Sequence, residues 1–453
     1  MRQVDFSSDK IFSTILQTSL PLLVAQLLTL LYSVVDRIYL GRIPGEGTAA
    51  LGGIGLCFPV IMLVTAFTNL YGSGGAPLCA IARGKGDRAQ AERIMNTAAC
   101  LLVLTGLVLL LAGELFAEPL LRLFGASDAS IVYALPYLRL YLLGTLFTMV
   151  ATGLCPYINA QGFPRTGMTT IAAGALCNLV LDPILIYGFG LGIRGAAIAT
   201  VLSQGVSAAL VIRFLRSGRA ELRLGRRPAD FTLDGKLCRS IVSLGSASFI
   251  MQCTNSLVSI ACNSVLARFG GDLYVSVMTT VSSVRQILDT PVGAITDGAS
   301  PVMSFNYGAR RPRRIVRILR AMTIVAVGYT AVVWLCILLF PRSFIAVFSS
   351  DPALMELAVP ALHIYFFAFI FQALQYSGQT VFKSLNKKKQ AIFFSLFRKV
   401  VMVVPLTYLL PHAAGLGASG VFLAEPISNF IGGCACFIAM LAMTLPELRR
   451  MEK

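Results

Sequence analysis

The chain has 453 residues, of which 56% are hydrophobic and only 13% are charged. Soluble domains carry about 25% charged residues. This chain therefore has too little polar surface to cover a soluble particle and too many apolar residues to be disordered. The 38 Lys and Arg residues exceed the 21 Asp and Glu residues and give a net charge of +17. In a polytopic membrane protein such an excess first reflects topology, so we expect membrane lipid as a partner and no nucleic acid.

Cysteine and histidine do not form a metal-binding pattern. The eleven cysteines are scattered through apolar runs, and the two histidines are His363 and His412. We expect the cysteines to pack as small hydrophobic side chains, and we predict neither a zinc site nor a cofactor. The polar segment Met1–Lys10 also lacks the pattern of a cleavable signal peptide.

Apolar segments long enough to cross a bilayer, about 20 residues each, recur along the whole chain. The first six span roughly residues 13–40, 50–80, 94–115, 131–159, 166–188 and 193–213. The second six span roughly residues 240–268, 273–305, 315–340, 356–382, 391–410 and 416–444. Stretches such as Leu101–Leu111 do not alternate as barrel strands do. The prediction is an all-α polytopic membrane protein with twelve transmembrane helices.

The basic residues gather in alternate connections. Most Lys and Arg residues fall at the two termini and near residues 83–93, 213–239, 310–320 and 383–399, and the last group includes Arg398 and Lys399. The positive-inside rule places these segments and both termini in the cytoplasm. We interpret the charge runs as solvated loops.

The two halves of the chain repeat each other at an offset of 224 residues. Eight of 27 positions between Leu115 and Tyr141 are identical to their counterparts, among them Pro136 with Pro360 and Tyr141 with Tyr365. Because each half holds six helices, the copies are parallel repeats, an arrangement typical of transporters. We predict two helical lobes, residues 1–212 and 240–453, joined by a cytoplasmic loop of residues 213–239.

Ionisable residues inside predicted helices point to function, because a charge near the bilayer centre is costly. Asp36 lies on the first helix, and Asn178 and Asp182 share one face of the fifth, just before Pro183. The two acids could share a site that takes up protons or binds Na⁺. Two alternatives remain open: Asp36 pairs with Arg37 or lies at the membrane interface, and Asp182 is a packing carboxyl. The repeat places no acid at the equivalent positions of the second half.

The chain resembles the multidrug and toxic compound extrusion (MATE) transporters over essentially its whole length. The segments that carry this resemblance are Ser19–Pro21, Val35–Asp36, Gly74–Pro77, Gly84–Asp87, Asn178–Pro183 and Gly195–Thr200. Asn306–Gly308 and Glu425–Ser428 are similar to the bacterial MepA-like and DinF-like branch.

The resemblance implies a V-shaped pair of six-helix lobes in the bacterial cytoplasmic membrane. It further implies export of cationic or amphipathic small molecules in exchange for H⁺ or Na⁺. In the DinF-like branch the cation site falls on Asp36, Asn178, Asp182 and Thr200, which would be the metal ligands if the ion is Na⁺. Tyr137 is then a neighbour of this site and a candidate substrate contact. Acids that the NorM-like branch carries in its second lobe are not matched here, where Gln252 and Gln375 occupy those regions.

Other residues are weaker candidates. Arg285 and Asp289 are four residues apart and are expected to neutralise each other. Glu425 lies within one residue of the repeat position of Thr200. We therefore predict a lone carboxyl, mostly protonated or hydrogen-bonded, that contacts substrate or a proton; a satisfied structural carboxyl is the alternative. Large apolar side chains would suit a cavity for apolar cations, although packing or lipid contact is the competing role. They are Phe58, Met62, Phe147 and Met278.

Three other functions fit the sequence less well than efflux. A flippase for a lipid-linked precursor belongs to the same wider superfamily, but such proteins line their cavity with several basic residues, whereas only Arg37, Arg139 and Arg285 fall in helices here. A channel would need a filter loop, and an intramembrane enzyme would need a nucleophile with a base or a cluster of acids. The sequence therefore favours a secondary-active efflux antiporter, not an enzyme, that works as a monomer.

Overall fold

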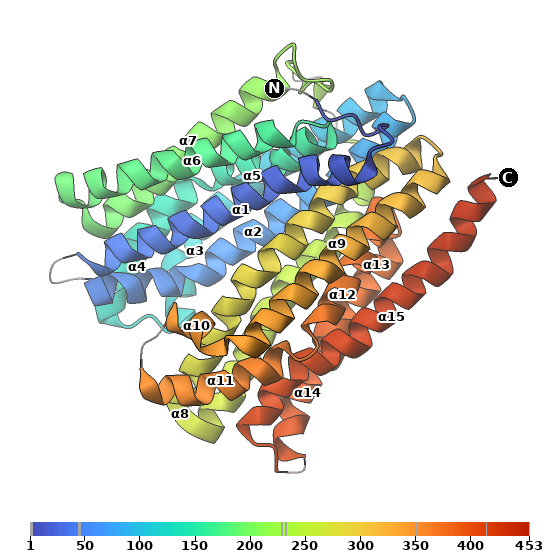
Figure 1. Cartoon of the computed structure of the whole chain (residues 1–453). Helices are drawn as coiled ribbons and strands as arrows, with labels where there is room; N and C mark the ends of the chain where they lie inside the picture. The colour runs from blue at the N-terminus through green and yellow to red at the C-terminus, as the bar shows by residue number, and fades with distance from the viewer. Residues whose placement is uncertain are drawn as a thin grey trace. The chain divides into compact units, whose positions relative to one another are not determined.

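The computed structural model describes residues 3–43, 47–227, 230–231, 233–348, 351–413 and 415–452. The regular elements in these residues are all helices (Figure 1), which confirms the predicted all-α class. In this described part, nine helices are long and apolar enough to cross a membrane, or up to eleven when each of two bent pairs is counted as one span. The chain is thus a multi-pass membrane protein.

The chain divides into two compact units. Unit 1 comprises Pro21–Gly245 together with the residues before Phe6, and unit 2 comprises Phe6–Leu20 and Ser246–Lys453. Both boundaries between the main parts fall inside helices, since Leu20 and Pro21 lie in α1 (Ile11–Gly41) and Gly245 lies in α8 (Gly235–Gly308).

Unit 1 contains the helices that follow α1. They are α2 (Gly47–Gly84), α3 (Arg88–Leu123), α4 (Asp128–Leu143), α5 (Thr145–Ala160), α6 (Pro164–Pro183), the π-helix η1 (Ile184–Gly188) and α7 (Gly192–Leu215). The sequence predicted one helix over 131–159, but the segments Ser130–Leu143 and Thr145–Ala160 meet at an angle of 54°. The bend falls at Gly144, where a Cβ atom would lie only 2.8 Å from Val201 Cγ2.

Unit 2 contains most of α8 and the elements after it. They are α9 (Pro312–Leu339), α10 (Pro341–Ala346), α11 (Pro352–Phe366), α12 (Phe369–Ser384), α13 (Lys388–Leu396), the π-helix η3 (Phe397–Val403), α14 (Val404–Leu409), η4 (Leu410–His412) and α15 (Ala418–Glu452). The predicted helix 356–382 is also bent, by 45° between Pro352–Phe366 and Phe369–Ser384.

The helix α8 turns back on itself in the middle. Its 74 residues would extend about 110 Å as a straight helix, far more than the ~30 Å of a bilayer core. Gly271 has φ +62°, a left-handed conformation that glycine adopts without penalty, and the first apolar span ends just before it at Phe269. The two arms therefore correspond to the predicted segments 240–268 and 273–305. The second arm does not reach the apolarity of the nine spans and carries Arg285, Asp289 and Asp297.

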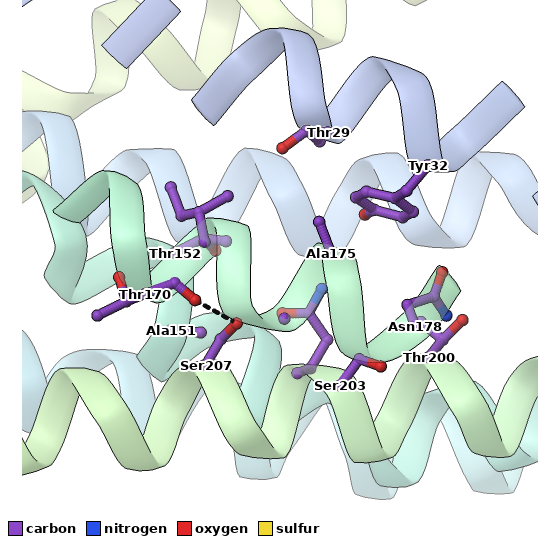
Figure 2. Close-up of a pocket in the computed structure, with 13 residues that line it drawn as sticks. Thr29, Tyr32, Ala151, Thr152, Thr170, Ala175, Asn178, Thr200, Ser203 and Ser207 are labelled. Carbon is purple, nitrogen blue, oxygen red and sulfur yellow. Dashed lines mark hydrogen bonds between the residues drawn. The ribbon is translucent and has the colours of Figure 1, made fainter. Parts of the chain in front are cut away.

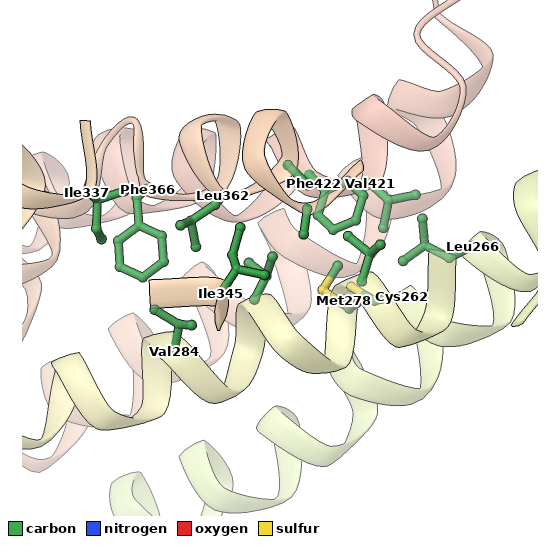
Figure 3. Close-up of a cluster of buried hydrophobic side chains, with 14 of the residues drawn as sticks. Cys262, Leu266, Met278, Val284, Ile337, Ile345, Leu362, Phe366, Val421 and Phe422 are labelled. Carbon is green, nitrogen blue, oxygen red and sulfur yellow. The ribbon is translucent and has the colours of Figure 1, made fainter. Parts of the chain in front are cut away.

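The core of unit 2 joins the two arms of α8 to the helices that follow. Cys262 and Leu266 of the first arm share one cluster of buried apolar side chains with Met278 of the second, and Phe366 and Phe422 complete it from α11 and α15 (Figure 3). Without water to drive association between membrane helices, such clusters hold the unit by close van der Waals packing.

Glycine allows α2 and the start of α8 to approach each other closely within unit 1. A Cβ atom on Gly245 would lie 1.8 Å from the carbonyl oxygen of Leu70, and one on Gly74 would lie 2.3 Å from the carbonyl oxygen of Ile241. Both contacts are with backbone atoms, which cannot rotate away. These two positions therefore require glycine.

The segment between α7 and α8 is tied to unit 1 by specific contacts. An Arg83 Nη2 atom lies 2.7 Å from Glu221 Oε2. The backbone N–H of Leu222 donates to Gln161 Oε1 over 2.9 Å, and that of Gly225 donates to Asn96 Oδ1 over 3.0 Å. These bonds satisfy backbone groups that a loop would otherwise leave to water.

The start of the chain is held inside unit 2. Phe6 is 1% exposed and packs edge-on against Phe305 with ring centroids 5.8 Å apart. Its carbonyl oxygen accepts from Asn306 Nδ2 over 3.0 Å, and Arg314 Nη1 donates to the carbonyl oxygen of Ser7 over 2.6 Å.

Candidate functional site

The predicted pair on α6 is a direct contact. Asn178 and Asp182 are 2% and 1% exposed, and Asn178 Nδ2 donates to Asp182 Oδ1 over 3.3 Å. One helical turn separates them, so the amide and the carboxylate stack on the same face. This bond uses the amide's nitrogen and leaves its oxygen directed elsewhere.

The helix changes its geometry directly after Asp182. Pro183 ends α6, and the next five residues form the π-helix η1, in which the N–H of Phe189 donates to the carbonyl oxygen of Ile184 over 2.9 Å. Proline has no N–H for the carbonyl of Leu179, one turn earlier. Such π segments are often found at functional sites.

Asp36 of α1 lies near the α6 pair. Its side chain is partly buried, and its carboxylate interacts electrostatically with that of Asp182 and with the phenols of Tyr32 and Tyr137. The structure thus brings together two acids that are 146 positions apart in the sequence. Arg37, the partner that the sequence offered as an alternative, is exposed and also interacts electrostatically with the Asp36 carboxylate.

Several oxygen atoms of this region are buried without a hydrogen-bond donor in the described part of the chain. They are Asp36 Oδ1, Asn178 Oδ1, Asp182 Oδ2 and Ser203 Oγ. An acceptor left unpaired in a buried site costs about 1–3 kcal/mol. Oxygen acceptors without donors are the groups that a proton or a hard cation would satisfy.

A pocket opens beside these residues between four helices of unit 1 (Figure 2). Thr29 and Tyr32 line it from α1, Thr152 lines it from α5, and Asn178 lines it from α6. The remaining lining residues belong to the same helices and α7: Ala151, Thr170, Ile171, Gly174, Ala175, Thr200, Ser203, Gln204 and Ser207. Nine of these thirteen residues carry a hydroxyl or an amide group, so the pocket offers hydrogen-bonding groups although it lies among apolar spans.

Thr200 and Ser207 differ in how their hydroxyls are used. Thr200 Oγ1 donates to the carbonyl oxygen of Ala196 over 3.0 Å, which leaves its lone pairs to accept or to ligate. Ser207 Oγ donates to the carbonyl oxygen of Thr170 over 3.0 Å, and Gly174 allows α6 and α7 to lie close enough for this bond (Figure 2).

The other predicted substrate contacts are not among the residues that line this pocket. Tyr137 is buried in the apolar core of unit 1 and stacks on Tyr141 with ring centroids 6.3 Å apart. Phe58 and Phe147 are 43% and 45% exposed, and Met62 is partly buried. Met278 belongs to the apolar core of unit 2 (Figure 3).

The expectation of a lone carboxyl at Glu425 is wrong, although the carboxyl is hydrogen-bonded, as the sequence also allowed. Glu425 is 3% exposed, and its Oε1 lies 2.9 Å from Arg285 Nη2, 3.0 Å from Arg398 Nη1 and 2.9 Å from Lys399 Nζ. The predicted pair of Arg285 with Asp289 is confirmed at 3.3 Å, but it is only part of the arrangement. We call Arg285, Arg398, Lys399, Glu425 and Asp289 the basic cluster.

The placement of Arg398 and Lys399 in a cytoplasmic loop is also wrong. Both lie in the π-helix η3, in the middle of the apolar span Lys388–His412, and they are 7% and 8% exposed. They were counted with the loop because they follow a run of lysines in the sequence. The repeat offers the signal that could have found them, since an offset of 224 places Arg398 opposite Gly174, which lines the pocket of unit 1.

A transition-metal centre is not indicated by the described residues. They contain no group of three or more His, Cys, Asp or Glu side chains that could hold a metal ion. The unit 1 site instead offers two carboxylates, an amide and a hydroxyl, a set of hard oxygen donors suited to H⁺ or Na⁺.

The fold, with its two repeated halves, is that of a repeat-built membrane transporter. The MatE family matches residues 21–184 and again residues 247–409. The chain therefore belongs to the MatE family of membrane transporters. The double match also agrees with the internal repeat predicted from the sequence.

Two curated relatives cover nearly the same length. The multidrug export protein MepA of Staphylococcus haemolyticus is 22% identical over 428 residues, which are 94% of this chain and 93% of the relative. A protein of Shewanella oneidensis named FAD transporter is 24% identical over 432 residues, 93% of each chain.

A solved structure shares the fold. An outward-facing multidrug resistance MATE family transporter superposes with a TM-score of 0.91 and 23% identity, covering 99% of both chains. This likeness confirms the predicted twelve-helix MATE fold.

Proposed function

We propose that the protein is a secondary-active exporter of small organic molecules that works by alternating access in exchange for H⁺ or Na⁺. In this proposal it lies in the bacterial cytoplasmic membrane with both termini inside and needs no cofactor. Cationic or amphipathic compounds are the starting hypothesis for its cargo, because a multidrug export protein is among its relatives.

One observation supports placing the coupling ion in unit 1. Among the described residues, Asp36, Asn178 and Asp182 each carry a buried oxygen without a donor, and two of these groups are acids close enough to interact. Two carboxylates in one low-dielectric site repel each other unless a cation or proton joins them. Binding of one ion would therefore stabilise the conformation in which the two acids lie together, and loss of the ion would favour a different conformation of the protein.

The test uses purified protein in proteoliposomes, with ethidium and flavin mononucleotide (FMN) as two probe substrates of opposite charge. Transport of either probe should drive counter-movement of H⁺, followed with an internal pH dye, or of ²²Na⁺. Asp36→Asn and Asp182→Asn should each abolish ion-driven export, because an amide cannot exchange a proton and binds Na⁺ weakly.

Asp128→Asn is the matched control. Asp128 is an acid of the same unit with a 93% exposed side chain, and within the described part of the chain it forms an ion pair with surface Arg122. Its replacement should leave transport unchanged. Export that persists at the wild-type rate in both Asp36→Asn and Asp182→Asn would show that the coupling ion binds elsewhere.

A flippase for a lipid-linked precursor is the second candidate, and the basic cluster favours it. The sequence had set this function aside because few basic residues fell in helices, but Arg398 and Lys399 add two buried ones. The experiments of the next section separate a soluble cargo from a lipid-linked one.

A further inference from the structure

We propose that the basic cluster of unit 2 binds the acidic group, a phosphate or a carboxylate, of the transported molecule. This inference deepens the proposed function, on which it rests for the role of the bound molecule as cargo. It names the charge of that cargo, which the family membership leaves open.

Positive charge exceeds negative charge in the basic cluster. Arg285, Arg398 and Lys399 carry three positive charges, and Glu425 and Asp289 supply two negative ones. The three basic side chains are only 9%, 9% and 10% exposed. An unmatched charge among membrane helices is costly and is usually retained for function. A bound anion would balance this excess.

The donors of the cluster converge in a way that suits an anion. All three cations reach the same oxygen, Oε1 of Glu425, within 3.0 Å. One carboxylate oxygen cannot use all the N–H groups of two guanidinium forks and an ammonium group, which have five, five and three donors. Arginine forks with lysine are a preferred set for phosphate and carboxylate.

Neighbouring side chains hold the arginines in place. Arg398 Nη1 donates to Asn429 Oδ1 over 2.7 Å, and Arg285 Nη2 donates to Gln372 Oε1 over 2.6 Å. The Arg285 guanidinium also lies over the ring of Tyr365, 5.1 Å from its centroid. Fixed donors lose little entropy when a ligand binds, so the site is preorganised.

The repeat relates this cluster to the pocket of unit 1. In unit 1, Gly174 of α6 lies against Ser207 of α7. In unit 2, Arg398 of η3 stands at the repeat position of Gly174 and lies against Gly432 of α15. The small residue of the contact is therefore on the first helix in unit 1 and on the second helix in unit 2. The place that is a pocket in unit 1 is therefore filled by basic side chains in unit 2. The acids Asp36 and Asp182 lie near this place in unit 1, whereas cations outnumber acids in the basic cluster of unit 2, so the net charges of the two places are opposite in sign.

Binding is measured with the purified full-length protein and a matched pair of probes. FMN and riboflavin share the flavin ring, and only FMN carries a phosphate. Quenching of flavin fluorescence should show that FMN binds at least about tenfold more tightly, because charge-assisted hydrogen bonds to the phosphate are lost with riboflavin. Equal affinity for the two flavins would overturn the inference.

Variants identify the cluster as the site. Arg398→Gln and Lys399→Gln should each reduce FMN affinity about tenfold while riboflavin binding is unchanged. Arg398→Lys keeps the charge and should retain most of the FMN affinity. Arg139→Gln is the control, because Arg139 is a half-exposed arginine in a helix of unit 1, 3.9 Å from Glu114. An equal loss of FMN affinity in Arg139→Gln would place the phosphate outside the cluster.

Glu425→Gln gives the sharpest result, because an anion site and a structural role predict opposite changes. Glu425 competes with the ligand for the same cations, so its neutralisation should raise FMN affinity several-fold. A purely structural carboxyl would give lower or equal affinity. Should Glu425→Gln fail to elute as a single folded species, the pair Arg398→Gln and Arg398→Lys decides the question: no difference in FMN affinity between them would overturn the inference.

Two further experiments distinguish a lipid-linked cargo from a soluble one, and the anion site of unit 2 from the coupling site of unit 1. In the first experiment, farnesyl phosphate, farnesol and unlabelled FMN compete with bound FMN. If farnesyl phosphate displaces bound FMN at a lower concentration than unlabelled FMN does, and farnesol does not displace it, the acidic group belongs to a lipid-linked cargo. If farnesyl phosphate displaces FMN less well than unlabelled FMN does, the acidic group belongs to a soluble cargo. The transport assay is independent. If Asp36→Asn leaves ion-driven export unchanged while FMN binds more tightly than riboflavin, the coupling proposal is refuted and the anion site of unit 2 is supported. If Asp36→Asn abolishes ion-driven export and the two flavins bind equally, the coupling proposal is supported and the anion site is refuted.

Discussion

The hydroxyl of Thr200 is a single group whose contribution to the unit 1 site can be isolated. It already donates to Ala196 and lines the pocket together with Asn178, so it has lone pairs for a bound ion. Thr200→Val keeps the shape of the side chain and removes these lone pairs. We expect the H⁺ or Na⁺ concentration for half-maximal transport to rise about three- to tenfold.

Thr200→Ser is the matched control, because it keeps the hydroxyl and removes only a methyl group. Its ion dependence should stay close to that of the original protein. If Thr200→Val and Thr200→Ser shift the ion dependence equally, the effect comes from packing and Thr200 is no ligand.

Residue-level prediction succeeded where the relevant spacing is local. Asn178 and Asp182 are one turn apart on a helix, so their contact follows from helical geometry alone. The basic cluster depends instead on Glu425, 27 positions from Arg398 and on another helix. Charge counting assigned Arg398 to the loop because it cannot recognise a buried cation whose counter-ion is distant in sequence.

At the scale of elements, the crossing of α2 and α8 depends on two glycines. Gly245→Ala would force a methyl group against the Leu70 carbonyl, and the helices would have to separate. Overpacking of this kind costs about 1–3 kcal/mol. We therefore expect Gly245→Ala to lower the temperature at which the detergent-solubilised protein loses its monodisperse peak in size-exclusion chromatography.

Gly293 on the same helix provides the comparison. No atom lies within 4 Å of a Cβ atom built there, so Gly293→Ala should be neutral or raise stability by about 0.4–1 kcal/mol. Equal thermal behaviour of the Gly245→Ala and Gly293→Ala variants would contradict the close approach of α2 and α8.

The helical segments were predictable because hydropathy and length determine them. The bends were not predictable, because hydropathy does not register the 54° and 45° angles within the segments 131–159 and 356–382. The first bend falls at Gly144, where Val201 of another helix lies close, and a contact of this kind leaves no mark in the hydropathy of a single segment.

At the scale of the whole molecule, the distribution of basic residues predicts the orientation in the membrane. We expect single cysteines at Arg219 and Lys389, in a background without other cysteines, to be protected from an impermeant thiol reagent outside intact cells. Cysteines at Leu191 and Leu416 should react, since these residues lie on the opposite side in the predicted topology. All four side chains are exposed, so local burial does not explain a difference.

The membrane supplies the physical reason for this pattern, because cytoplasmic loops retain Lys and Arg. Labelling at Lys389 from outside, with protection at Leu191, would reverse the proposed orientation. Permeabilised cells serve as the control, and there all four cysteines should react.

The position of Phe6 within unit 2 has a consequence for synthesis of the chain. The carbonyl of Phe6 is bound by Asn306, 300 residues later, and Arg314 binds the carbonyl of Ser7. During synthesis Phe6 and Ser7 therefore wait without these partners until the ribosome has added about 300 further residues. For the same reason a fragment that starts at Ser246 would lack Phe6–Leu20, the residues that complete its own unit.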